Sequence, residues 1–329
     1  MRINDFLNLR WEDNGRPLIE PRWNSPILAD PSFLFPTETL GKQWVLFAHT
    51  VWGIRRYESE DGIRWMDKGS VIRNAMRPFC RFIDGAFRLY YEAYRPFAVV
   101  SQILPKPPIW RSHIELRSSA DLKHWSQPGI PFPEEFEWME DKELGKSVSN
   151  PCLVSLSQES GKRDGPYDAD GPYRLYFSAS LSYISDCGFC EPRYIGAAHG
   201  PKPEGPFRAL PRPIIDPNND HLPGVLGAGS VKVISLEDGF VGLQNKIYRD
   251  GQCRSRSALF ILRSEDGLSW QSAQKEPLLS PSEGWRASHV YACDCRQDKD
   301  GSWYLYYNAR DGWYKSKGKE RIGRLVGRS

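Results

Sequence analysis

The number of arginines and the spacing of some cysteines in this sequence are those of residues that bind anions and metal ions. The chain has 29 arginines against 15 lysines, and a guanidinium group binds carboxylates and phosphates through paired hydrogen bonds. Cys187 and Cys190 in "CGFC" have the spacing of half a zinc site, for which Cys253 would be a third ligand. The arginines predict either recognition of an anion or ordinary pairing with surface carboxylates. The cysteines predict either a zinc site or simple packing.

Packing is the interpretation we favour for the cysteines. Cys293 and Cys295 in "CDC" alternate along an expected strand, so both side chains point to one face, toward a neighbouring sheet. Cys80 and Cys152 fall in similar strands and read as small buried apolar residues. We therefore predict no metal and no cofactor.

Composition and charge exclude several function classes. The net charge is +3 in 329 residues, with no block of like charges, so we expect neither a nucleic-acid nor a membrane partner. The first residues are polar, and no apolar run approaches the ~18 residues that span a bilayer. Together with an odd number of cysteines, this predicts a cytoplasmic protein. Phosphate-binding glycine loops, GxSxG and HExxH are all absent.

A seven-residue phrase recurs along the chain as "SEDGIRW" (59–65), "SADLKHW" (119–125) and "SEDGLSW" (264–270). Serine with aspartate or Asp-Gly favours a tight turn into an outer strand. The following tryptophan is expected to pack between neighbouring sheets. We therefore interpret the phrase as scaffold.

The phrase ends a longer pattern of strands and tight turns. Five such units predict an all-β, five-bladed propeller of four-stranded antiparallel blades in a single domain, 1–329. The expected blades are 25–70, 71–130, 146–212, 225–276 and 284–327. The last unit has three strands, so an N-terminal strand within "GRPLIEPRW" (15–23) should close the ring. Long insertions at 96–110, 129–146 and 157–172 are predicted to be loops.

At this point the sequence resembles a known group of enzymes. "ADPSFLF", "DGAFRLYYEAY", "SADLKHW", "GPKPEGPF" and "DGSWYLYYNA" are similar to segments of the five-bladed propeller glycosidases, glycoside hydrolase family 43 and its relatives 32, 62, 68, 117 and 130. The resemblance covers about residues 25 to 327. It implies a substrate over the central funnel and two opposed carboxyl groups, one protonating the leaving oxygen while the other attacks or activates water.

The resemblance assigns residues one blade at a time. Asp30 in "ADP" matches the first catalytic carboxylate, as base or nucleophile. Arg77 stands beside the proline where the families have an acidic residue, and Asn150 stands where several relatives have one. Ser230 begins the fourth blade, which has no glutamate there, and His289 matches a histidine that is common in family 43. The usual second carboxylate is missing from these positions.

The proton donor is therefore left open among several residues. Glu92 and Asp186 are preferred, because both directly follow a second strand. His289 is the further alternative, since family 117 uses a histidine in place of one carboxylate. The remaining loop carboxylates are Glu191, Asp250 and Asp311.

Substrate binding is assigned to Arg77, Asn150 and Ser230, with Trp52 as an aromatic platform beside the alternatives Trp110 and Trp313. Arg193 and Arg256 are added because several arginines start loops or third strands. The others are Arg55, Arg95, Arg111, Arg254 and Arg310. If three or more of these arginines faced the funnel, the pocket would suit an anion such as a uronate or sugar phosphate.

The sequence thus predicts an enzyme that cleaves a glycosidic bond in a small saccharide or glycoconjugate, anionic ones included. The partner is a small-molecule saccharide or an anionic metabolite. A non-hydrolytic propeller is the alternative: a sugar-binding protein, or a transferase, lyase or cyclase acting on an anionic metabolite.

Overall fold

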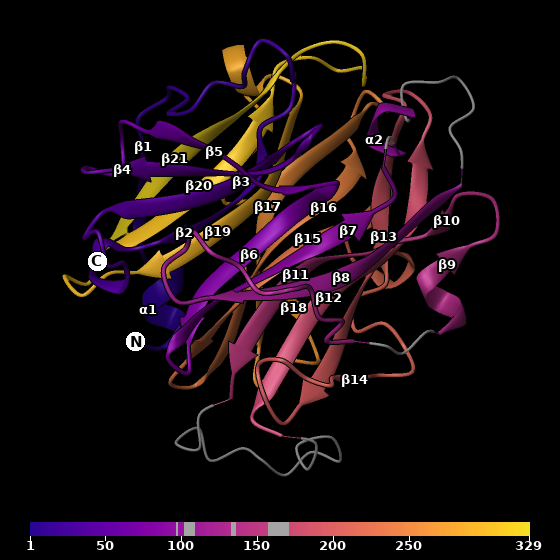
Figure 1. The fold of residues 1–329 in the computed structure, drawn as a ribbon. Coiled ribbons are helices and arrows are strands. Elements are labelled where there is room, and N and C mark those ends of the chain that lie inside the picture. Colours follow the sequence, from indigo (N-terminus) through magenta and orange to yellow (C-terminus); the bar gives the residue numbers. More distant parts are fainter. Residues whose placement is uncertain (97, 102–108, 133–135, 157–170) are drawn as a thin grey trace.

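Five small antiparallel sheets surround a common axis in the computed structural model (Figure 1). The structure describes residues 1–96, 98–101, 109–132, 136–156 and 171–329. This architecture confirms the predicted all-β propeller. Among the described residues, no helix is long and apolar enough to cross a membrane.

The blades are numbered in chain order, and each begins with its innermost strand. Blade 1 contains β2 (Ala29–Leu34), β3 (Trp44–Thr50), β4 (Gly53–Ser59) and β5 (Met66–Arg73). Blade 2 contains β6 (Ala75–Ile83), β7 (Ala86–Tyr94), β8 (Trp110–Ser119), β10 (Gly145–Lys146) and β9 (Glu140–Asp141). Blade 3 contains β11 (Val148–Ser155), β12 (Tyr173–Ile184), β13 (Phe189–Gly200) and β14 (Arg208–Ala209). Blade 4 contains β15 (Val225–Leu236), β16 (Gly239–Arg249), β17 (Ser255–Ser264) and β18 (Gln271–Ser272).

Blade 5 joins the two ends of the chain. It contains β19 (His289–Gln297), β20 (Trp303–Arg310), β21 (Glu320–Arg328) and the N-terminal β1 (Arg10–Asp13). The helices are short: α1 (Ile3–Leu7) and α2 (Ala98–Ser101), with single 3-10 turns at Pro36–Glu38, Glu137–Met139, Pro217–Asn219 and Gly284–Arg286.

The closing strand lies earlier in the chain than the sequence predicted. Residues of β1 pair antiparallel with β21, from Arg10 opposite Arg328 to Asp13 opposite Leu325. The predicted segment 15–23 contributes only an isolated bridge between Ile19 and Ile322. Its two prolines have no N–H to donate, which limits it as a ladder partner. An N-terminal strand closes the ring as expected, but from another segment.

Blade 2 also departs from a simple four-stranded meander. Beyond β8, Leu116 makes only an isolated bridge to Gly129. The edge of β8 nearest the cavity is instead extended by β10, which runs parallel to it with Gly145 opposite Trp110. The insertion at 129–146 is therefore partly structured, and it returns to the sheet next to Trp110.

The recurring phrase makes the same turn each time. In the first copy the Ser59 hydroxyl accepts the Gly62 N–H at 2.9 Å, and Asp61 accepts two further backbone N–H groups. Trp65 then packs edge-on against Tyr306 of blade 5, with ring centroids 5.6 Å apart. The other two copies place Trp125 against Phe47 and Trp270 against Tyr176. The scaffold role predicted for the phrase is confirmed.

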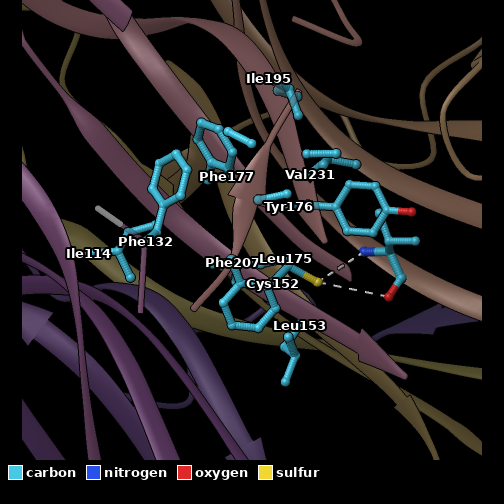
Figure 2. Close-up of a cluster of buried hydrophobic side chains, with 14 of the residues drawn as sticks. Ile114, Phe132, Cys152, Leu153, Leu175, Tyr176, Phe177, Ile195, Phe207 and Val231 are labelled. Carbon is cyan, nitrogen blue, oxygen red and sulfur yellow. Dashed lines mark hydrogen bonds between the residues drawn. The ribbon is translucent and has the colours of Figure 1, made fainter. Parts of the chain in front are cut away.

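The hydrophobic core lies between the blades. Figure 2 shows one cluster in which Phe177 of β12 packs near Phe132 and Ile195, while Cys152 of β11 contacts the backbone of Val233 in blade 4. Four cysteines are buried in inner strands, as the sequence predicted: Cys80, Cys152, Cys293 and Cys295.

Charged side chains fill the axis below the mouth of the propeller. Asp294 of β19 is fully buried and accepts hydrogen bonds from Arg81 of β6 at 2.5 and 2.9 Å. The same carboxylate accepts the Ser32 hydroxyl at 3.2 Å and the Phe33 N–H at 3.0 Å, both from β2. Lys232 of β15 donates to the Pro151 carbonyl of β11 at 2.9 Å. These contacts join β19, β6 and β2 in one group and β15 with β11 in another.

Asp294→Ala should destabilise the protein by about 3–5 kcal/mol, because Arg81 would be left buried without its counter-ion. Urea unfolding would measure the change. Glu12→Ala is the control: Glu12 pairs with Arg328 at the exposed surface, and its removal should cost less than about 0.5 kcal/mol. Equal losses for the two variants would contradict a structural role for the axial pair.

Candidate active site

The inner strands share an irregularity at one level of the propeller. In β2, β6 and β11 two residues face a single residue of the partner strand, and the first of the two has a left-handed backbone. These residues are Asp30, Arg77 and Asn150, with φ of 50°, 55° and 51°. Each is followed by a proline, which has no N–H to leave unpaired in the bulge. Such a conformation costs a non-glycine residue of the order of 1–3 kcal/mol and is concentrated at functional sites.

The remaining two blades follow the same plan. In β15 the bulge contains Gly229, with φ of 63°. In β19 the register shifts between Val290 and Cys293, which places Tyr291 in the bulge. All five bulges contribute to one cavity of about 410 Å³ at the mouth of the propeller. The repeated strand irregularity therefore builds the ring of residues that faces a ligand.

Four carboxyl groups line this cavity among the described residues: the exposed Glu143, and three that strands of three different blades supply. Asp30 comes from the bulge of β2, Glu191 from the beginning of β13, and Glu320 from the beginning of β21. Asn308 of β20 connects two of them: its Oδ1 accepts the Asp30 N–H at 3.1 Å, and its Nδ2 donates to Glu320 Oε2 at 3.1 Å. The site is therefore rich in carboxyl groups despite the missing acids of the inner strands.

Glu191 holds its proton at neutral pH. Burial is the main cause of a rise in its pKa to about 8; the positive charge of Arg77 opposes the rise, and the negative charges of Glu320 and Asp30 add to it. Its side chain is half-buried and lines the cavity. A protonated carboxyl group in a cavity can act as a general acid.

Glu320 is also buried, and burial raises its pKa. Arg310 opposes that rise by donating to Glu320 Oε1 at 3.1 Å, whereas the charge of Asp30 adds to it. Because Arg310 and Asn308 occupy both of its oxygens, Glu320 is better suited to shape the charge of the site than to move a proton.

His49 of β3 lies beside Asp30 and is neutral at physiological pH. Burial lowers its pKa to about 4; the Asp30 charge opposes this shift and Arg77 adds to it. Its Nδ1 accepts the Arg77 backbone N–H at 3.3 Å and lies 3.3 Å from Asp30 Oδ2. Accepting at Nδ1 assigns the remaining proton to Nε2.

Arg77 is held by Glu92, one of the residues predicted as a proton donor. Arg77 Nη1 donates to Glu92 Oε2 at 2.5 Å, and Trp110 Nε1 donates to Oε1 at 3.1 Å. Glu92 is fully buried and is not among the described residues that line the cavity. It is the counter-ion of Arg77, so we do not retain it as the acid.

The other two predicted donors also lie outside the described lining of the cavity. Asp186, in the loop between β12 and β13 of blade 3, accepts the N–H of Ser255 in blade 4 at 2.7 Å. His289 stacks on Tyr291 with ring centroids 5.3 Å apart, and burial with the charge of Arg310 lowers its pKa to about 3. A histidine with that pKa carries no proton to donate near neutrality.

Four predicted binding residues do reach the cavity: Arg77, Asn150, Ser230 and Trp52. Two predicted arginines do not. Arg193 lies over the Tyr194 ring at 5.1 Å, and Arg256 donates to Asp250 at 3.0 Å.

The other arginines mostly form ion pairs with carboxylates of the protein. The pairs are Arg55 with Asp67, Arg111 with Glu140, Arg254 with Asp250, and Arg310 with Glu320. Arg95 is exposed. Among the described lining residues Arg77 is the one arginine, so the arginine-rich pocket considered from the sequence does not form there.

The zinc alternative has no support in the described part of the chain. There, no group of three or more His, Cys, Asp or Glu side chains is placed to hold a metal ion. Cys187 is buried and its Sγ contacts the Ile184 carbonyl, Cys190 lines the cavity, and Cys253 is exposed.

Comparison with known proteins bears on this architecture. No protein-family model and no curated protein matches the sequence. Solved structures do match. A glycosyl hydrolase from Bacteroides ovatus has a TM-score of 0.65 at 14% identity, with 99% of this chain and 95% of that protein covered. A thermostable family-43 glycoside hydrolase has a TM-score of 0.61 at 14% identity, with 95% and 91% covered. Zg3597, a family 117 glycoside hydrolase from Zobellia galactanivorans, has a TM-score of 0.60 at 16% identity, with 97% and 90% covered.

The chain has the fold of the five-bladed propeller glycoside hydrolases. The resemblance seen in the sequence is therefore confirmed at the level of architecture. At these identities the likeness shows the fold alone, and activity has to be argued from the residues of the site.

Sequence reasoning missed Glu320 and His49 and ranked Glu191 below other carboxylates. Glu191 and Glu320 both stand near the beginning of a third strand, in "CEPR" and "KERIG". The available signal was this shared position, a glutamate where a third strand starts from the loop facing the mouth.

Glu191→Gln should change how stability depends on pH. Because the folded pKa is raised to about 8, the stabilising effect of the bound proton is complete below the unfolded pKa and is lost as pH rises through 8. The wild type should therefore lose stability relative to the glutamine variant between about pH 4.5 and pH 8, on the order of a few kcal/mol. Urea unfolding of both proteins across this range measures it, and parallel curves would contradict a buried, protonated Glu191.

Proposed function

We propose that the protein is a glycoside hydrolase that cleaves a glycosidic bond in a small saccharide or glycoconjugate. Asp30 would be the base or nucleophile and Glu191 the general acid. The observation that supports this proposal best is the convergence of Asp30 and Glu191, from different blades, on one cavity in which Arg77 interacts electrostatically with both.

The two carboxyl groups have environments suited to different tasks. Asp30 feels the positive charge of Arg77, which gives its ionised form an electrostatic partner. Glu191 is kept protonated by burial and by its acidic neighbours. Glycosidic cleavage needs this division, an acid for the leaving oxygen and a base or nucleophile for the anomeric carbon or its water.

Arg77 supports the division by its position. Its Coulombic partners are Glu92, Asp30 and Glu191, with Glu92 the strongest. In this role Arg77 stabilises negative charge on Asp30 in the resting enzyme and on Glu191 after it has given up its proton. An arginine can thus act where the related enzymes have a further carboxylate.

The sugar we propose is uncharged. Besides the protonated Glu191, the described lining holds the carboxyl groups of Asp30, Glu143 and Glu320. Its two cations are Lys315 and Arg77, of which Arg77 is already paired with Glu92, so an added anion would meet more negative than positive charge. Asn150, Ser230 and Asn245 line the same cavity and can bond sugar hydroxyl groups. This preference replaces the anionic substrate considered from the sequence.

Asp30→Asn and Glu191→Gln should each lower kcat/KM by about a thousandfold or more on any glycoside that the wild type cleaves, because each removes one of the two reacting carboxyl groups. Reducing-sugar release across a panel of neutral and acidic oligosaccharides measures this. Asp186→Asn is the matched control, a carboxylate outside the described cavity lining, and should keep activity within about twofold. If the folded wild type releases no reducing sugar from any member of the panel, the hydrolase proposal is wrong, and a sugar-binding protein or non-hydrolytic chemistry becomes the assignment.

The pH profile gives an independent check on the acid. Since Glu191 must be protonated to act, kcat/KM should be steady on the acidic side of its pKa and fall as pH rises above about 8. Measuring kcat/KM on any active glycoside between pH 5 and pH 10 would show where this fall occurs. A fall centred near pH 5 would point to another acid.

A further inference from the structure

The cavity has two chemically different parts. The inner strands supply a polar floor that contains Asp30, Arg77, Asn150 and Ser230. Side chains from the loops and strand ends above it are mostly apolar: Ile27, Val51, Trp52, Trp110, Leu181 and Phe189. We call these six residues the apolar wall. They come from blades 1, 2 and 3, so the wall surrounds one side of the mouth.

The wall offers contact area but few hydrogen bonds. Trp52 Nε1 donates to the Asn24 carbonyl at 3.0 Å, and Trp110 Nε1 donates to Glu92 and Ser112 at 3.1 and 3.0 Å. An indole has a single N–H donor and no acceptor, so both tryptophans have used theirs within the protein. The other four wall residues have purely hydrocarbon side chains.

Trp52 is unusual for its exposure. Its side chain is 52% exposed although it is held by the bond to Asn24 at the turn between β3 and β4. A fixed, exposed indole beside a ligand cavity leaves apolar area in water that a ligand would cover. The charged residues Glu143 and Lys315 also line the cavity, and both are exposed wholly or in part, so they can remain solvated.

The volume limits what can bind. A cavity of about 410 Å³ lies near the small end of the range for ligand pockets. It fits one sugar ring on the polar floor and one further compact group against the wall. A second sugar ring at the wall would bring hydroxyl groups against side chains that have no donor or acceptor to spare, and unpaired polar groups lose binding energy.

We propose that the substrate is a glycoside of a compact apolar alcohol with an aromatic ring, whose sugar lies on the polar floor and whose aglycone packs against the apolar wall. This inference rests on the proposed hydrolase function and adds the class of its leaving group. The reaction is hydrolysis: the bond from the anomeric carbon to the aglycone oxygen breaks, Glu191 protonates that oxygen, and water supplies the new hydroxyl group on the sugar.

The test compares benzyl glycosides with disaccharides of the same sugar, across common neutral hexoses and pentoses. Benzyl alcohol is less acidic than a sugar hydroxyl and is the poorer leaving group, so faster cleavage of the benzyl glycoside would report binding of the aglycone. For the sugar that is cleaved, kcat/KM should be at least about tenfold higher for the benzyl glycoside. Trp52→Ala should lower kcat/KM about tenfold for the benzyl glycoside and less than about twofold for the disaccharide.

Trp23→Ala is the matched control. Trp23 is 94% exposed and is not among the described residues that line the cavity, so its loss should leave kcat/KM unchanged for both substrates. If the disaccharide is cleaved as well as the benzyl glycoside, or if Trp52→Ala affects both equally, the aglycone inference is overturned while the hydrolase proposal stands.

Turnover of neither substrate would overturn the hydrolase proposal, and binding then decides the inference. Binding is measured by calorimetric titration of the wild type, Trp52→Ala and Trp23→Ala with the benzyl glycosides. Binding weakened by Trp52→Ala but not by Trp23→Ala would support an apolar-substituted sugar as the ligand. No binding at millimolar concentrations would overturn it.

Discussion

The buried pair between Arg81 and Asp294 is the interaction on which the rest of the propeller depends. Five wedge-shaped sheets meet at the axis, where inner strands of neighbouring blades expose backbone groups that no ladder satisfies on that side. Asp294 accepts from Arg81 of blade 2 and from Ser32 and Phe33 of blade 1, so one carboxylate fixes three blades relative to one another. Removing water from these charges is costly, and only a full set of partners makes the arrangement stable.

The same strands carry the site one level higher. A bulge with a left-handed residue turns a side chain that would follow the pleat into one that points up the funnel. Asp30, Arg77 and Asn150 repeat this device with a following proline in three consecutive blades. Asparagine and aspartate accept that backbone readily, but arginine does so rarely. The arginine is held by its ion pair with the buried Glu92, so strain in the strand and a charge in the cavity are maintained by one contact.

The fold could be predicted from the sequence because its evidence is local and repeated. The "SEDG" and "SADL" turns, the alternating strands and the tryptophans each specify a contact within a blade or with its neighbour. The closing strand was misplaced because "RWED" and "GRPLIEPRW" are both short and near the chain start, and only pairing with β21 separates them. The inner-strand residues Asp30, Arg77, Asn150 and Ser230 were also found, since their place in the blade determines their place in the funnel.

The proton donor could not be chosen from the sequence, because burial and neighbouring charge distinguish one carboxylate from another. Glu92 lies near the end of a second strand, Asp186 just after one and Glu191 near the start of a third, and nothing in the residue types ranks them. In the folded chain Glu92 is neutralised by Arg77, and Asp186 is bound to a loop amide. Of these three carboxylates, Glu191 is the one among the described lining residues of the cavity, and burial raises its pKa to about 8.

In the mechanism that we propose, Arg77 stands where the sequence resemblance leads one to expect a carboxylate, and Glu191 of a third strand serves as the acid. A carboxylate at position 77 would stand near Asp30 and Glu191 and would raise the pKa of both groups. Arg77 has the opposite effect and favours the ionised form of Asp30, while burial and Glu320 outweigh it at Glu191. Burial and acidic neighbours thus keep Glu191 protonated, while Arg77 supplies positive charge beside Asp30. That difference is what acid and base catalysis across a glycosidic bond requires.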